Sequence, residues 1–95
     1  MDRRREERFR SNLVIQVGMG YGVLRDLSAS GVYFTTDQSF AVGDALTFAV
    51  EFRGAPTGPV AATCKARVLR VEAQGPGANG IAASISDIQF RRIPG

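Results

Sequence analysis

The sequence contains no histidine and no tryptophan, and it has only one cysteine and one lysine. Histidine and cysteine side chains are the main protein ligands of zinc and other transition metals, so a metal centre has almost no ligands available. The single thiol, Cys64, excludes an internal disulfide. Without histidine, neither a Ser-His nor a Cys-His catalytic pair can form. The carboxylates are scattered singly, and we interpret the chain as a binding domain that is not an enzyme and uses no cofactor.

Long hydrophobic runs are also missing. No apolar stretch approaches the length of a membrane span, and the N-terminus, MDRRREERFR, lacks the apolar segment of a secretory signal. We therefore expect a cytoplasmic protein with no membrane span. At 95 residues, of which 44% are hydrophobic and 22% charged, the chain has room for one domain with one core.

The sequence does contain repeated period-two alternation of apolar and polar residues. In LTFAVEF, residues 46, 48, 50 and 52 are apolar and face one side, which is typical of a half-buried strand. Similar segments lie at 13–17 and 21–26, joined by a glycine-bearing turn at 18–20, and at 31–36. With no long amphipathic helix, the pattern predicts an all-β fold, a small six-stranded antiparallel β-barrel.

The two C-terminal segments are less regular. In residues 60–73 the apolar face changes after Val68, because Cys64, Ala66 and Val68 suit one face while Leu69 and Val71 suit the other. A β-bulge in one long strand explains this change of phase. We expect a final strand near 80–86, followed by a turn or a short helical piece that ends at Phe90.

The first ten residues include five arginines. Arginine binds phosphate bidentately and stacks on flat rings, so this composition favours an anionic partner. A solvated charge run is the simpler interpretation when the segment is taken alone. However, Arg4 and Arg8 repel one another on a common face, and an anion between them relieves this repulsion. We predict a single domain over 1–95, with a flexible ligand-binding arm at 1–11 and the barrel at 12–90.

A second polar cluster lies in RDLSASGVYF, between two apolar runs. Asp26 and Ser28 commonly bond to nearby backbone amides, and Gly31 suits a positive φ, so a capped turn is the simplest interpretation. Alternatively, the Asp26 carboxylate accepts hydrogen bonds from the adjacent N–H donors of a guanine edge, with Ser28 adding a hydroxyl and Gly31 allowing close approach.

These two clusters together match a pair of motifs. Residues 4–8, RREER, fit RxxxR, and residues 26–31, DLSASG, fit DxSxxG about twenty residues later. In this order, on a predicted six-stranded barrel, they resemble the PilZ domain family of bacterial cyclic di-GMP receptors, and the resemblance extends over essentially all 95 residues. It implies that cyclic di-GMP is bound by Arg4, Arg8, Asp26, Ser28 and Gly31, with support from Arg3, Arg5 and Ser30. A basic residue before RxxxR, here Arg3, tends in that family to accompany two ligand molecules per chain.

The resemblance also implies a mechanism, in which the arm becomes ordered on binding and the signal passes to an unidentified protein effector. Many family members continue into a C-terminal helix, whereas this sequence ends at FRRIPG. Two alternatives remain open at this stage. One is a small basic barrel that binds single-stranded nucleic acid, which the absence of an aromatic-rich strand face disfavours. The other is a protein adaptor that binds no nucleotide.

Overall fold

The structure is a computed structural model that describes residues 9–54, 56 and 58–94. Within this part of the chain the regular elements are all strands. They are β1 (Phe9–Arg10), β2 (Val14–Val17), β3 (Gly20–Leu27), β4 (Gly31–Thr36), β5 (Ala45–Phe52), β6 (Val60–Gly75) and β7 (Ala78–Arg92).

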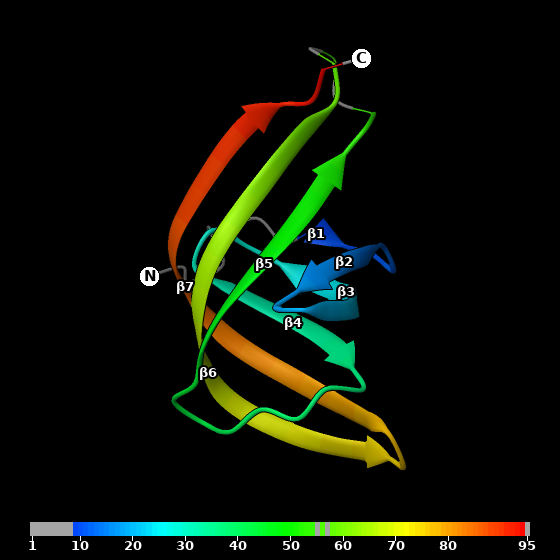
Figure 1. The fold of residues 1–95 in the computed structure, drawn as a ribbon, viewed down its shortest axis with the longest axis vertical. Helices are drawn as coiled ribbons and strands as arrows, with labels where there is room; N and C mark the ends of the chain where they lie inside the picture. The colour runs from blue at the N-terminus through cyan, green and yellow to red at the C-terminus, as the bar shows by residue number, and fades with distance from the viewer. Residues whose placement is uncertain (1–8, 55, 57, 95) are drawn as a thin grey trace, which may run out of the picture.

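Six of these strands close into a barrel (Figure 1). The order of neighbours is β3-β2-β5-β6-β7-β4, and β4 pairs again with β3, so the sheet returns to its starting strand. Every pairing is antiparallel. Within the closed part of the barrel, closure removes edge strands that would otherwise offer unpaired backbone groups to other chains. The predicted six-stranded antiparallel barrel is confirmed.

The short strand β1 lies in line with β2 and does not add a seventh strand around the barrel. It pairs with β3 at Leu27 and Asp26, while β2 pairs with β3 over 20–23, so β1 and β2 lie one after the other along the same strand. The Phe9 ring packs edge-on against Phe52 of β5, with centroids 5.7 Å apart. Two residues of the predicted arm, Phe9 and Arg10, therefore lie in β1, and residues 1–8 are outside the described structure.

Side chains alternate between the inside and the outside of the barrel along each strand, and the inward-facing ones form the core. Leu46, Phe48 and Val50 of β5 are buried, as the LTFAVEF pattern predicts, and Phe52 packs at the edge of the same cluster. Burying a side chain of this size contributes about 1.5–3 kcal/mol, so these rows hold the barrel closed. The other fully buried large side chains come from the remaining five barrel strands: Ile15, Val17, Leu24, Phe34, Cys64, Val68 and Ile81.

Several turns form as the sequence predicts. The β2–β3 hairpin turns at Gly18, whose φ of 57° is in the left-handed region that glycine favours. The segment between β4 and β5 turns at Gly43, where Asp44 caps the bend by accepting a hydrogen bond from the Ala41 N–H at 2.8 Å.

The prediction for the C-terminal segment was wrong. β7 does not stop near residue 86 and no helical piece follows, because the strand continues to Arg92. Ser86 is an extra residue between Ile85, which pairs with Ala66, and Asp87, which pairs with Lys65. This bulge spaces the inward apolar residues Ile85 and Ile88 three apart, and that spacing imitates a helix. In Figure 1 the C-terminal ends of β5 and β7 lie beside the beginning of β6, near the C-terminus.

Candidate functional site

The polar cluster of the sequence forms the turn between β3 and β4. The backbone N–H of Ser28 donates to the Gly31 carbonyl at 2.9 Å, and the Ser28 hydroxyl lies 3.4 Å from the same oxygen. The capped turn is therefore present. The expected positive φ at Gly31 is wrong, since Gly31 is not among the glycines in the left-handed region. A Cβ built at Gly31 would meet only the Ala83 carbonyl at an ordinary 3.5 Å.

A bulge in β3 determines where the Asp26 side chain points. Leu24 pairs with Phe34 and Asp26 pairs with Tyr33, so Arg25 is an extra residue in the ladder. In a regular strand Asp26 would share the inward face of Leu24, two residues earlier. The bulge shifts the phase by one and places Asp26 on the outer face, beside Tyr33.

A second bulge, in β6, determines where the Arg70 side chain points. Val68 pairs with Ala83 and Arg70 pairs with Ala82, which leaves Leu69 as the extra residue. Val68 is buried and points inward, so without the bulge Arg70 would point into the core as well. The disturbed alternation predicted from the sequence is confirmed at this point. Its consequence is a basic side chain on the outer wall.

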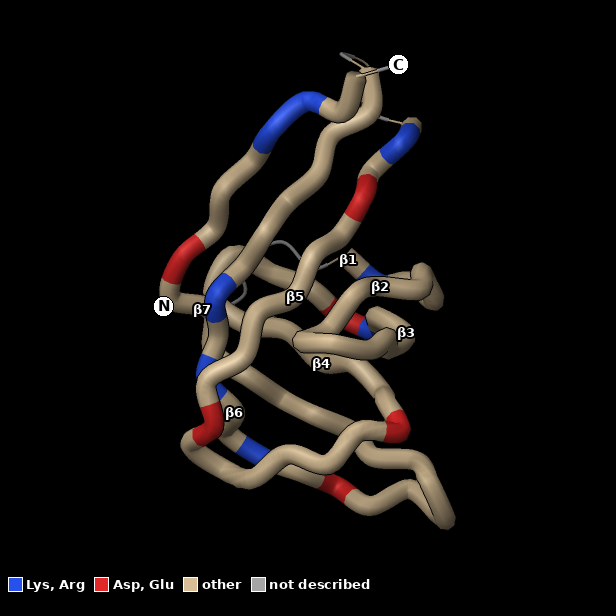
Figure 2. The backbone as a smooth tube through the Cα atoms, in the orientation of Figure 1, with Lys and Arg blue, Asp and Glu red and all other residues tan. Residues whose placement is uncertain are grey.

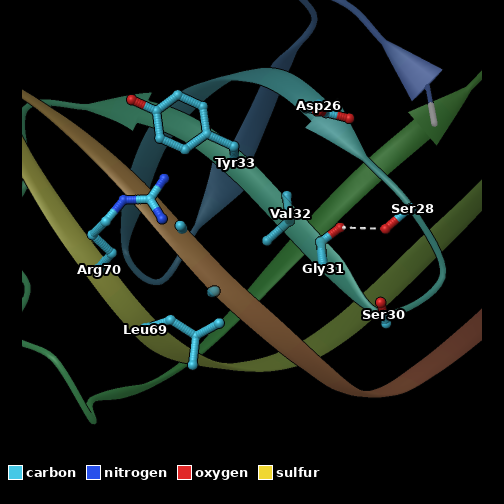
Figure 3. A pocket seen from close by; sticks show the side chains of 10 residues that line it. Asp26, Ser28, Ser30, Gly31, Val32, Tyr33, Leu69 and Arg70 are labelled. Atoms are coloured by element: carbon cyan, nitrogen blue, oxygen red, sulfur yellow. Dashed lines mark hydrogen bonds between the residues drawn. The ribbon is translucent and has the colours of Figure 1, made fainter. Parts of the chain in front are cut away.

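These two bulges align one outward-facing row across four strands. The Cα partners run from Asp26 to Tyr33, from Tyr33 to Ala82 and from Ala82 to Arg70. Ala82 is small, so a hollow remains between the larger side chains on either side. In Figure 3, Tyr33 and Arg70 flank β7, and the turn with Ser28 and Gly31 lies at the other end of the hollow.

A hydrogen-bonded cluster holds one wall of this hollow in place. The Tyr33 hydroxyl donates to Glu72 at 3.1 Å, and Arg70 Nε donates to the same carboxylate at 2.7 Å. Gln74 Nε2 in turn donates to the Tyr33 hydroxyl at 2.7 Å. The hydrogen bond from Arg70, followed by that from Tyr33, lowers the pKa of Glu72. Burial, followed by the bond to Glu72, raises the pKa of Tyr33.

The result is an open pocket of about 450 Å³. Four sequence-predicted residues line it: Asp26, Ser28, Gly31 and Ser30. The other four, Arg3, Arg4, Arg5 and Arg8, lie outside the described residues. The further lining residues include Tyr33, Leu69 and Arg70, which were not among the predicted site residues. From the sequence, Tyr33 is more simply a cross-strand aromatic residue and Arg70 an exposed charge. The change of apolar face after Val68 was the sequence feature from which Leu69 and Arg70 could have been predicted.

A larger hollow of about 790 Å³ lies near β1 and is mostly apolar. Phe9, Leu13, Val14 and Phe52 line it, with Glu51 and Arg53 at its rim. Glu51 and Arg53 form an ion pair with each other at 2.8 Å. This hollow offers few polar groups to a charged ligand, so the pocket at the β3–β4 turn is the better candidate site.

The described residues form neither a metal site nor a membrane-spanning helix. No group of three or more histidine, cysteine, aspartate or glutamate side chains there is placed to hold a metal ion. Within the same residues, no helix is long and apolar enough to cross a membrane.

The fold and the pocket define a class of protein, a small antiparallel β-barrel with a polar pocket on its outer face. Comparison with protein families identifies the family within this class, because the PilZ domain model matches residues 2–94. This chain belongs to the PilZ domain family, whose members are receptors or adaptors for cyclic di-GMP rather than enzymes.

A solved structure supports the same fold. The Bacillus subtilis inhibitor of motility, MotI/DgrA, superposes with a TM-score of 0.74 at 19% sequence identity. The match covers 94% of this chain and 45% of the MotI/DgrA chain, so this chain spans less than half the length of that protein. None of the curated protein sequences that were compared matches this chain.

Proposed function

We propose that this chain is a cyclic di-GMP receptor whose site combines the pocket at the β3–β4 turn with the arginine arm. The observation that carries the proposal is the position of β1. Phe9 is the Cα partner of Leu27, the residue directly before Ser28. Residues 1–8 of the arm directly precede Phe9 in the chain, so the arm joins the barrel next to the DxSxxG turn. Arg8 and Arg4 thus belong to a segment that is attached beside the turn that lines the pocket.

The chemistry of the pocket suits a guanine nucleotide with phosphates. The Asp26 carboxylate accepts hydrogen bonds from the adjacent N–H groups of a guanine edge, and the Ser28 hydroxyl adds a second polar contact. Arg4 and Arg8 bind the phosphates bidentately, and such charge-assisted hydrogen bonds are about twice as strong as neutral ones. Arg70 adds a further guanidinium to the pocket wall.

Gly31 supports this proposal because the fold does not require a glycine there. Its φ is not positive, and a Cβ would make only an ordinary contact with the Ala83 carbonyl. An alanine would fit the unliganded barrel. The missing side chain instead leaves the backbone open to close approach from the pocket side.

The mechanism follows from the charges of the arm. Without ligand, the like-charged arginines repel one another. With cyclic di-GMP bound, its phosphates neutralise them, and the free energy of these contacts favours a conformation in which the arm covers the pocket. A protein effector that binds only this conformation receives the signal.

Isothermal titration calorimetry with cyclic di-GMP tests the proposal. We expect the wild-type chain to bind and Arg4→Ala or Arg8→Ala to abolish measurable binding, because each removes a phosphate contact. Arg92→Ala is the matched control, since this exposed arginine lies at the far end of β7, and it should bind like wild type. Circular dichroism should show the same fold for all four proteins.

Three results would contradict the proposal. They are wild-type affinity in Arg4→Ala or Arg8→Ala, no heat with the wild-type chain, and preferential binding of single-stranded oligonucleotides with a steep salt dependence. The same titration gives the stoichiometry. A ratio of two ligands per chain that falls to one in Arg3→Ala would assign the second molecule to Arg3.

A further inference from the structure

The C-terminal half of β7 has an open edge. β4 pairs with β7 from Asn79 to Ser84 and goes no further, while β6 pairs with β7 to Arg92. Among the described residues, no strand pairs with the other side of the segment Ser86–Arg92, which we call the β7 edge. An open edge offers a row of backbone N–H and C=O groups to another strand.

The hydrogen-bond pattern determines which residues face outward along this edge. The Ile93 N–H donates to the Pro59 carbonyl at 3.0 Å, so Ile93 directs its backbone toward the β6 side. In an antiparallel ladder this direction alternates, and the register is unbroken between Asp87 and Arg92. Asp87, Gln89 and Arg91 therefore bond to β6, while the backbone groups of Ile88, Phe90 and Arg92 face the open edge.

The side chains of the β7 edge also include an unpartnered apolar group. Ile88 pairs with Cys64 and Phe90 with Ala62, and both of these β6 residues are buried. Phe90 thus lies on the inward face of the sheet, yet its side chain is 66% exposed. This exposed phenylalanine is an apolar surface that another chain can cover.

The β7 edge is complementary to itself. If two copies pair antiparallel about Gln89, Asp87 of each copy lies opposite Arg91 of the other, and Ile88 lies opposite Phe90. The Asp87–Arg91 pairs fall at non-hydrogen-bonded positions, where opposing side chains are closest. The Ile88–Phe90 pairs fall where both residues direct their backbone groups outward. One register satisfies the charges, the apolar side chains and the backbone together.

The two neighbouring registers do not place opposite charges across from one another. Centred on Phe90, the pairing sets Asp87 opposite Ile93 and Gln89 opposite Arg91, with no opposite charges paired. Centred on Ile88, it sets Asp87 opposite Gln89 and Ser86 opposite Phe90. Within each chain Asp87 already faces Lys65 of β6, so a second cation from the other copy would place it between two positive charges.

We propose that the β7 edge is a homodimer interface, in which two copies of this chain join β6 and β7 into one continuous sheet across a two-fold axis at Gln89. The partner is a second copy because the charge order of the segment, acidic at 87 and basic at 91, matches its own reverse. This interface is independent of the nucleotide proposal, since it uses none of the pocket residues.

A charge exchange tests the register. Asp87→Arg places arginine opposite Arg91 of the other copy, and Arg91→Asp places aspartate opposite Asp87, so each single variant should shift sedimentation toward the monomer. The double variant Asp87→Arg/Arg91→Asp recreates opposite charges across the axis and should restore the dimer. A wild-type chain that is monomeric up to its solubility limit would overturn the proposal, and so would a double variant that stays monomeric.

A disulfide trap tests the axis. Residue 89 faces its own copy at a non-hydrogen-bonded pair, where the Cα atoms are about 4.5 Å apart, within the range for a disulfide. Gln89→Cys should therefore yield a disulfide-linked dimer on mild oxidation. Asp87→Cys is the matched control and should not, because its counterpart is Arg91. The native Cys64 is 1% exposed and contributes no background. Equal cross-linking of both variants would overturn the two-fold axis at Gln89.

Discussion

Gly80 lacks a side chain at the point where the Tyr33 ring crosses β7. A Cβ at this position would overlap the Tyr33 hydroxyl and lie 2.8 Å from Gln74 Nε2. The glycine lets Tyr33 lean along the sheet surface to reach Glu72, the acceptor that also holds Arg70. Two pocket residues from different strands are thus fixed by one carboxylate, and that arrangement depends on one missing methyl group.

Gly80→Ala should displace Tyr33 from Glu72. Burial and the hydrogen bond to Glu72 raise the pKa of Tyr33, so losing both should return this pKa toward its ordinary value of 10.0. Ultraviolet titration in a Tyr21→Phe background, where Tyr33 is the remaining tyrosine, measures the shift. Gly54→Ala is the matched control, because a Cβ there meets nothing within 4 Å. An unchanged Tyr33 pKa in Gly80→Ala would contradict this account.

The bulges are the element that positions the site. Each adds one residue to a strand and so exchanges the faces of every residue beyond it. Arg25 in β3 and Leu69 in β6 turn Asp26 and Arg70 outward onto the same row. The pocket therefore depends on the number of residues in two strands as much as on their identity.

Deletions in β6 test this dependence. Removing Leu69 makes Val68 and Arg70 adjacent, opposite the adjacent pair Ala83 and Ala82, so the strand becomes regular and every other side chain keeps its face. We expect a folded protein that melts close to wild type. Removing Thr63, an exposed residue of the regular part of β6, reverses the faces on one side of the deletion and should unfold the domain. Equal melting temperatures in the two variants would show that the bulge does not set the phase.

The sequence predicted the strands wherever alternation was regular. LTFAVEF and GVYFTT became β5 and β4, because apolar residues two apart need a core on one side only. The turn at Ser28 was also predicted, since its polar residues stand between two apolar runs. The position of Arg70 beside Tyr33 was not predicted. The two residues are 37 positions apart in the sequence, and their proximity depends on how β4, β7 and β6 pair. The end of β7 was predicted wrongly because Ser86 adds an extra residue that interrupts the alternation.

At the scale of the whole molecule, closure places the central part of β6 between β5 and β7, and Cys64 lies there in the core. Burial, together with the nearby Asp87 charge, raises the pKa of the Cys64 thiol from 9.0 to about 11. The thiolate forms freely only after the barrel opens, so this group links global unfolding to pH.

The stability of the barrel should therefore fall in alkali. The folded-state pKa of Cys64 exceeds the unfolded value, so its contribution is complete below pH 9 and is lost as the pH rises to about 11. Two pH units correspond to about 3 kcal/mol of unfolding free energy. Urea denaturation across this range measures the loss. Cys64→Ala should show a shallower decline, because the other titrating groups are common to both proteins, and parallel curves would contradict the assignment.

Basic and acidic positions are both spread along the described strands and are not gathered at one end (Figure 2). The outer side of β6 carries three basic residues in succession, Lys65, Arg67 and Arg70, followed by Glu72. Two more acidic residues lie nearby in the chain's neighbouring elements, Asp44 in the turn before β5 and Asp87 in β7. An anion approaching this surface meets local pairs of opposite charge. Under the proposed function, selective binding of a phosphate ligand then depends on the arginine arm.

The backbone hydrogen bond from the Ile85 N–H to the Ser30 carbonyl, 2.9 Å long, joins the turn that carries Ser28 and Gly31 to β7. It lies where the β4–β7 pairing ends, after Ser84, and where the segment that only β6 pairs begins. The turn that lines the pocket is therefore bonded to the residue directly before the β7 edge, so the two proposed sites are neighbours along one strand.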